Sequence, residues 1–281
     1  MESVPIVLAF ACAVVYGIAD YSGGRASRST SSMVITLVGQ SSSLLVAFAA
    51  VAIAGQAPPG LADWAWGAGV GIAGAVALVA FYRAMAQGAM TVVAPITAVV
   101  SASLPVAFGL ARGERPEPLA LVGIAIAVAA VLLVSGAIGV THVRTPGPVI
   151  GLAVLAGVGF ALVFIGLEQT SESSGFWPLI AARLASVTGM VVLVRRSKVT
   201  LPTARHTWIL AVTSGVLDMS ANVLYLLAVR RGLLSIVAAV SSLYPVSTVC
   251  LAFGLDRERV TRWQATGMGL AGVALVLVSV A

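Results

Sequence analysis

Apolar stretches of about 20 residues recur along the whole chain, and almost no charge interrupts them. Of the 281 residues, 59% are hydrophobic and 9% are charged, whereas roughly a quarter of the residues of a soluble domain are charged. An α-helix needs about 20 apolar residues to cross the hydrocarbon core of a bilayer. The pattern therefore predicts an all-α membrane protein, because a water-soluble fold would need more charge on its surface.

Ten such stretches, each bounded by charge, proline or glycine, predict ten transmembrane helices. The connections between them are short, as at 112–118 and 256–262, and leave no room for a soluble domain or a long linker. A single membrane domain is expected. The predicted helices cover residues 4–22, 33–54, 64–86, 91–111, 118–138, 148–167, 176–195, 207–229, 233–254 and 263–281.

The second half of the chain repeats the first at an offset of about 144 residues. Residues 78–135 align without gaps to residues 222–279, and Gly88 pairs with Gly232. Each half contains five predicted helices, and an odd number makes the two copies cross the membrane in opposite senses. The sequence therefore predicts two inverted five-helix repeats, related by a pseudo-two-fold axis in the membrane plane. The repeats are residues 1–140 and 146–281.

Each half has a Glu-Arg turn before its last helix, at 114–115 and 258–259, and that helix is rich in glycine and closes on Leu-Val-Ser. With the repeat, these features resemble the EamA-type permeases of the drug/metabolite transporter superfamily over essentially the whole chain. The resemblance implies a ten-helix basket around a central cavity, which exports or exchanges amino acids and similar metabolites. It assigns no substrate-binding motif to numbered positions.

Basic residues gather at alternate connections and bear on orientation. The positive-inside rule places both termini outside, whereas the family resemblance implies cytoplasmic termini, and both orientations stay open. The net charge of +6 lies in short clusters without a continuous basic face, so nucleic acid is not an expected partner. Odd-numbered connections and adjoining helix ends hold Arg25, Arg28, Arg83, Arg144, Arg195, Arg196, Lys198, Arg205, Arg257, Arg259 and Arg262, and even-numbered ones hold Arg112, Arg115, Arg230 and Arg231.

Two charges lie well inside apolar helices, Arg183 in the seventh and Asp218 in the eighth. A charge at the centre of a membrane helix costs about 2.5–3.5 kcal/mol on insertion scales, so such residues usually pair or serve a function. The two helices are consecutive and antiparallel, which brings both groups to a similar depth. We expect an ion pair at a substrate site, and a purely structural link between the helices is the alternative.

Four polar residues follow one another on the eighth helix at spacings of four, four and three: Ser214, Asp218, Asn222 and Tyr225. These spacings place them on one face, while valine and leucine occupy the opposite face. A polar face inside a membrane must meet protein or water. It predicts a cavity wall, with interhelical hydrogen bonding as the alternative.

Aromatic and acidic residues of the first and sixth helices form a second candidate group. Tyr16 and Phe160 occupy equivalent positions of the repeat, which predicts aromatic walls on either side of the cavity, although simple packing would give the same pattern. Asp20 and Glu168 lie near the predicted helix ends. They are expected to be solvated, with a role as gate or proton acceptor as the alternative.

Proline and glycine mark further positions inside the predicted helices. Pro95, Pro105 and Pro245 free backbone carbonyls, which predicts a lined cavity or hinge, or equally a kink relieved by neighbouring hydroxyls. Tyr244, beside Pro245, is a candidate lining residue. Two sets of glycines predict close helix packing: Gly67, Gly71 and Gly74 in the third helix, and Gly267, Gly269 and Gly272 in the tenth.

Catalytic and cofactor motifs are missing from the sequence. It contains no glycine-rich phosphate loop, and both histidines, His142 and His206, fall in predicted loops. We therefore expect neither an enzyme nor a bound metal or cofactor.

The combined features favour a secondary transporter that moves a small polar metabolite, with amino acids as the leading class, by alternating access. A single lysine and abundant alanine, valine and glycine suggest bacterial coding and a place in the inner membrane. A proton on Asp218 is a candidate coupling ion. A lipid-linked head-group flippase and a non-transporting scaffold are the alternatives. The candidate substrate-binding residues are Tyr16, Phe160, Arg183, Ser214, Asp218, Asn222, Tyr225 and Tyr244.

Overall fold

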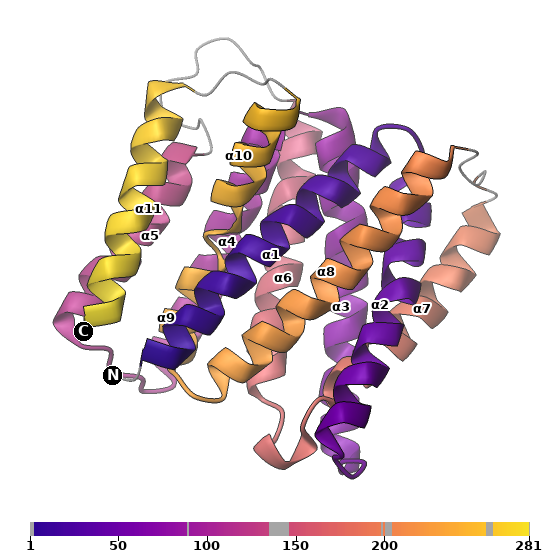
Figure 1. The fold of residues 1–281 in the computed structure, drawn as a ribbon, viewed down its shortest axis with the longest axis horizontal. Coiled ribbons are helices and arrows are strands. Elements are labelled where there is room, and N and C mark those ends of the chain that lie inside the picture. The colour runs from indigo at the N-terminus through magenta and orange to yellow at the C-terminus, as the bar shows by residue number, and fades with distance from the viewer. Residues whose placement is uncertain are drawn as a thin grey trace.

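A computed structural model describes residues 3–88, 90–134, 146–197, 199, 204–256 and 261–280 (Figure 1). The described chain is a bundle of α-helices joined by short connections. The helices are α1 (Ser3–Ser27), α2 (Ser32–Ala54), α3 (Leu61–Gln87), α4 (Met90–Ala111), α5 (Pro118–Val134), α6 (Gly147–Glu168), α7 (Trp177–Ser197), α8 (Arg205–Val229), α9 (Leu234–Ser241), α10 (Tyr244–Leu255) and α11 (Arg262–Val280), with a 3-10 turn η1 (Glu172–Ser174) between α6 and α7.

Ten spans result, because α9 and α10 follow each other as one span, Leu234–Leu255. Eight of the spans are long and apolar enough to cross a membrane, α5 is a shorter apolar helix, and α11 is 19 residues long and packs along α5. An even number of spans returns the chain to its starting side, and Figure 1 shows both termini at the same end of the bundle. The prediction of ten helices is confirmed.

Large apolar side chains cover the outside of this bundle. Ile53, Leu45 and Val7 are 87%, 74% and 63% exposed. Such a surface would be unfavourable in water, but it is suited to the hydrocarbon of a bilayer. The protein is therefore a multi-pass integral membrane protein.

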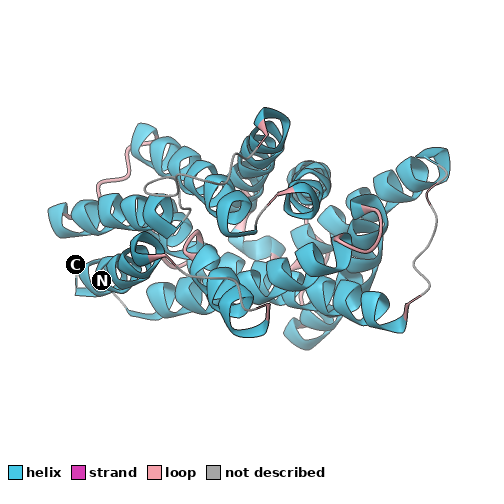
Figure 2. Cartoon of the chain, turned by 90° about the horizontal axis from the view of Figure 1, so that it is seen from above, coloured by secondary structure: helices cyan, strands magenta, loops and turns pink. Residues whose placement is uncertain are grey.

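The helices pack in a pattern that is preserved when the two halves are exchanged. Helix α1 packs on α8 as α6 packs on α3, and α2 packs on α8 as α7 packs on α3. Helices α2 and α7 are equivalent in the two halves, as are α5 and α11, and each helix contacts its own equivalent. Figure 2 shows the bundle from one end, with helices inclined to one another. The contacts indicate a pseudo-two-fold axis between two inverted five-span halves.

Glycines allow the helices next to this axis to approach closely. At Gly71 of α3 an added Cβ would lie 2.0 Å from the carbonyl oxygen of Ala182 in α7. At Gly215 of α8 it would lie 2.0 Å from the carbonyl oxygen of Gly39 in α2. Gly71 and Gly215 are 144 positions apart, so the two halves make the same backbone contact.

The predicted role of glycine in close packing holds for one of the two helices. An added Cβ at Gly67 would meet α7 at 2.5 Å, and one at Gly74 would meet α6 at 3.3 Å. The prediction is wrong for Gly269 and Gly272, where an added Cβ meets nothing within 4 Å. Helix α11 lies at the edge of the bundle and packs chiefly on α5, so these glycines face outward.

Two helix boundaries differ from the prediction in ways that affect the site. Helix α1 continues to Ser27 instead of ending at 22, which puts Asp20 inside the helix. The ninth span is interrupted at Ser242 and Leu243, just before Pro245, whereas α4 continues through its two prolines. The second Glu-Arg turn (258–259), His142 and the expected boundary between the repeats lie outside the described residues.

Candidate substrate site

A small cavity lies where helices from both halves meet near the centre of the bundle. Its volume is about 40 Å³, and one water needs roughly 10–15 Å³. Pockets that hold small ligands usually measure about 300–1,000 Å³. The cavity in this structure is therefore smaller than the pockets that hold small ligands. The lining residues are Tyr16, Asp20, Gln40, Val70, Gly74, Leu78, Phe160, Val163, Phe164, Leu179, Ala182, Arg183, Asp218, Asn222 and Tyr244.

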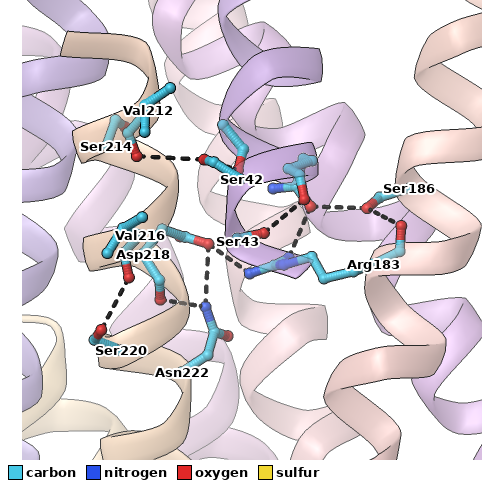
Figure 3. A network of polar contacts seen from close by, with 12 residues as sticks. Ser42, Ser43, Arg183, Ser186, Val212, Ser214, Val216, Asp218, Ser220 and Asn222 are labelled. Atoms are coloured by element: carbon cyan, nitrogen blue, oxygen red, sulfur yellow. Dashed lines mark hydrogen bonds and ion pairs between the residues drawn. The ribbon is translucent and has the colours of Figure 1, made fainter. Parts of the chain in front are cut away.

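The predicted ion pair lines this cavity, and Figure 3 shows it within a network of polar contacts. Arg183 of α7 donates from Nη2 to Oδ2 of Asp218 in α8, at 2.5 Å. The two residues are 6% and 9% exposed. Asn222, one turn further along α8, donates from Nδ2 to the same carboxylate oxygen at 3.3 Å and to the Asp218 carbonyl oxygen at 2.8 Å. The carboxylate is thus held by a cation and an amide.

Gln40 of α2 is a second hydrogen-bond partner of Arg183, and sequence reasoning missed it. Its Oε1 accepts from Arg183 Nη1 at 2.8 Å and from Ser186 Oγ at 2.7 Å, and the residue is 2% exposed. The signal was present: an amide followed by three serines interrupts an otherwise apolar helix at 40–43. An intramembrane amide needs a partner as a charge does, although its cost is smaller.

The site is asymmetric although the scaffold repeats. The residue 144 positions before Asp218 is Gly74, which also lines the cavity. Gln40 and Arg183 also occupy equivalent positions, 143 residues apart. Each directly follows the residue whose carbonyl oxygen meets a glycine of the other contact helix: Gly39 meets Gly215, and Ala182 meets Gly71. The second half therefore supplies both members of the ion pair, while the first half supplies the amide of Gln40 and a glycine at the position equivalent to Asp218.

The polar face predicted on α8 is present, but its four residues have different surroundings. All of them are buried, and only Asp218 and Asn222 line the cavity. Ser214 shares a hydrogen bond of 2.8 Å with the Tyr82 hydroxyl. Tyr225 donates to the Phe164 carbonyl oxygen at 3.2 Å. Both interpretations of the face thus apply, each to half of its residues.

Aromatic rings surround the cavity beside the ion pair. Tyr16 and Phe160 both line it, as the repeat predicted. The Tyr16 ring centroid lies 6.2 Å from that of Phe164, and the Phe164 ring stacks on Tyr225 at 4.4 Å. Tyr244 lines the cavity from the first turn of α10 and donates to a carbonyl oxygen of α4 at 3.4 Å. Tyr16, Phe160, Phe164 and Tyr244 thus give the cavity an aromatic lining beside the ion pair.

The expectation that Asp20 is solvated is wrong. The residue is 5% exposed and lines the cavity, because α1 extends beyond it by two further turns. It makes no hydrogen bond or ion pair with any residue that the structure describes. Glu168, by contrast, is half-buried at the end of α6 and hydrogen-bonded to Gln169.

Polar contacts link the two halves at each end of the bundle. At the end that holds both termini, the Glu114 carboxylate accepts from the backbone N–H groups of Leu234 and Ser235, at 2.7 and 2.9 Å. At the opposite end, Arg25 pairs with Asp256 at 2.7 Å. These contacts join α1 to α10 and the α4–α5 connection to α9.

The connection between α6 and α7 is also fastened at the first of these ends. Asp63 accepts from the backbone N–H and the hydroxyl of Ser171, both at 2.7 Å. Arg230 donates to the Ser171 carbonyl oxygen at 3.1 Å. Burial lowers the pKa of the Arg230 guanidinium, and the nearby carboxylates of Glu172 and Asp63 oppose that effect.

Comparison with known proteins agrees with this architecture. A solved structure titled "Crystal structure of protein" is similar over 99% of this chain and 99% of its own, with a TM-score of 0.73 and 16% sequence identity, which shows a shared fold. No curated protein matches the sequence. The model of the EamA-like transporter family matches twice, over residues 3–136 and 147–280. The two matches account for nearly all of both halves, and the chain belongs to the EamA-like transporter family.

Proposed function

We propose that this transporter carries a small zwitterionic metabolite, with amino acids as the leading class, by alternating access through the central cavity. The observation that supports this most directly is the buried Arg183–Asp218 pair on the cavity wall. A guanidinium and a carboxylate are the natural partners of a substrate carboxylate and ammonium group. The bacterial inner membrane is the proposed location.

Without substrate, Arg183 and Asp218 would neutralise each other in the way that the charged groups of a bound zwitterion would neutralise them. This pairing avoids an isolated charge in the membrane. A zwitterion that enters between them exchanges one protein pair for two protein–substrate pairs, so neither charge is left alone. Gly74 lies on the same cavity, and because it has no side chain it leaves the cavity wall there to backbone atoms that a substrate could approach.

The repeat supports the movement that such a carrier needs. Rocking two inverted halves about a central site converts an outward-facing form into an inward-facing one. The contacts at the two ends, Glu114 with the start of α9 and Arg25 with Asp256, would have to open alternately. The helix break at Ser242 and Leu243 is the proposed hinge in the span that carries Tyr244.

A coupling proton is better placed on Asp20 than on Asp218. Arg183 and Asn222 already stabilise Asp218 as a carboxylate. Asp20 lines the same cavity without a partner among the described residues, and an isolated carboxylate there would bear a large desolvation cost that protonation removes. The charged and titratable groups that face it are Asp218, Tyr82 and Tyr244.

Flux through purified protein tests the proposal. Proteoliposomes loaded with a mixture of unlabelled amino acids should exchange them for labelled ones, and Asp218→Asn should abolish the exchange. Glu117→Gln is the matched control, because Glu117 is exposed at the α4–α5 connection. Unchanged exchange by Asp218→Asn would remove Asp218 from the mechanism. Comparing metabolites inside cells and in the medium, with the protein overproduced or deleted, would identify a substrate of another class.

A further inference from the structure

A groove on the outside of the bundle lies between α6 and α7, and α3 forms its floor. Helix α3 packs against both of its neighbours, while α6 and α7 stay apart. The groove has a volume of about 480 Å³. Its lining includes exposed apolar side chains such as Leu155 and Val192, and the buried side chains of Ala75 and Met190. It therefore opens towards the hydrocarbon of the membrane.

Two arginines line one end of this groove. Arg83 lies near the end of α3 and Arg196 near the end of α7, so both sit close to the membrane surface. Both are exposed, and neither makes a hydrogen bond or ion pair with a residue that the structure describes. The sequence from 173 to 217 contains no acidic residue. The groove is thus apolar along most of its length and has two arginines at one end.

The inverted repeat supplies a second groove that serves as an internal comparison. It lies between α2 and α8 at the other end of the bundle and has a volume of about 470 Å³. Most of its lining is equivalent to that of the first groove. Four residues of α2 lie 143 positions before residues of the first groove: Val46 before Gly189, Ala49 before Val192, Ala50 before Leu193 and Ile53 before Arg196. Three residues of α8 lie 144 positions after residues of the first groove: Ser220 after Val76, Val223 after Val79 and Leu224 after Ala80.

Charged residues line only the first of these two grooves. Ile53 occupies the position equivalent to Arg196, and Leu227, 144 positions after Arg83, occupies the position equivalent to Arg83. Ile53 is 87% exposed to the membrane. The scaffold alone therefore produces an apolar groove on each side, and only the groove at the arginine-rich end has acquired charge.

We propose that the groove between α6 and α7 binds a phospholipid with a negatively charged headgroup. An acyl chain would fill the apolar part, and Arg83 and Arg196 would hold the phosphate. Guanidinium groups bind phosphate oxygens through charge-assisted, often paired hydrogen bonds. Basic pockets between membrane helices are suited to anionic lipids, and each basic residue near the surface adds to the attraction.

The bound lipid would contact the helix that carries the cation of the central site. Ser186 of α7 lines the groove, and its hydroxyl donates to Gln40, which also accepts from Arg183. A lipid bound in the groove would contact both α7 and α3, and would therefore stabilise the packing of these two helices. The prediction concerns binding and does not depend on which metabolite is transported.

Lipid retention by the purified protein tests the site. Native mass spectrometry after exchange into detergent with phosphatidylglycerol should show a retained lipid, and phosphatidylcholine should be retained far less. The double variant Arg83→Gln/Arg196→Gln should bind phosphatidylglycerol roughly tenfold to thirtyfold more weakly. Arg195→Gln, in the same turn of α7 but outside the groove, is the control and should retain the lipid. Equal retention by the double variant and the wild type would overturn the proposal.

A second variant tests the location of the acyl chain independently of charge. An added Cβ at Gly189 meets nothing within 4 Å, so Gly189→Leu should fold normally while filling the groove. Retention of phosphatidylglycerol should then fall several-fold. Gly69→Leu is the control, because Gly69 is equally open but lies outside the groove. Undiminished retention by Gly189→Leu would show that the lipid does not occupy this groove.

Discussion

The Asp218 carboxylate lies 2.5 Å from Nη2 of Arg183, and Nη1 of the same guanidinium donates to Gln40 at 2.8 Å. Removing one member of a buried pair leaves an unpaired charge and costs about 3–5 kcal/mol, whereas replacing both members is often neutral. If the pair is only a structural link, replacing both residues should preserve transport, whereas a substrate site requires both charges.

Neutralising both charges separates these two roles. Asp218→Asn alone should unfold at a lower temperature and lose transport, because Arg183 keeps its charge without its carboxylate. The double variant Arg183→Gln/Asp218→Asn should recover most of the thermal stability and remain without transport. Thermal unfolding in detergent and flux in proteoliposomes measure the two effects. A double variant that is stable and transports normally would reduce the pair to a link between α7 and α8.

If Asp20 carries the coupling proton, its loss should affect gradient-driven accumulation of substrate but not substrate exchange. Asp20→Asn keeps the size of the side chain but cannot release a proton. The variant should exchange substrate at nearly the wild-type rate, and it should no longer accumulate substrate in response to a pH gradient. Labelled uptake with and without an imposed gradient measures both activities.

The matched control for this experiment is Glu168→Gln, since Glu168 is half-buried at the end of α6 and already hydrogen-bonded to Gln169. It should behave as the wild type does. Gradient-driven accumulation that survives in Asp20→Asn would remove the proton from this residue. The infrared band of a protonated carboxyl, present in the wild type and missing in Asp20→Asn, would report protonation without any transport assay.

The equivalent glycine contacts predict that small substitutions near the axis are severe. Gly71→Ala and Gly215→Ala each place a Cβ 2.0 Å from a backbone carbonyl oxygen, and backbone can yield only if the helices separate. Overpacking of this kind costs about 1–3 kcal/mol or more. Both variants should lower the unfolding temperature and the yield of folded protein. Gly69→Ala, which meets nothing within 4 Å, should not, and equal damage by all three variants would contradict the explanation.

Strong, local signals in the sequence predicted the fold and part of the site. The apolar stretches and the repeat gave the ten spans, and the cost of an intramembrane charge identified Arg183 and Asp218 as partners. Asp20 was misplaced because no charge or proline ends α1 at 22, and small polar residues continued the helix. Gln40 was missed because an amide is less conspicuous than a charge. The grooves depend on which helices leave gaps between them, a tertiary property that helix periodicity does not contain.

The distribution of basic residues predicts the orientation of the bundle. The arginine-rich end holds the connection after α1 and the ends of α3 and α7, while both termini lie at the opposite end. The positive-inside rule therefore places the termini outside the cytoplasm. A phosphatase fused to the C-terminus should be active, and a fluorescent protein fused there should stay dark. Fusions that end at Ser197 are the control, because α7 ends on the arginine-rich side and should give the reverse result. A fluorescent C-terminal fusion together with an active phosphatase at Ser197 would mean that the bundle is inserted the other way, as the family resemblance implies.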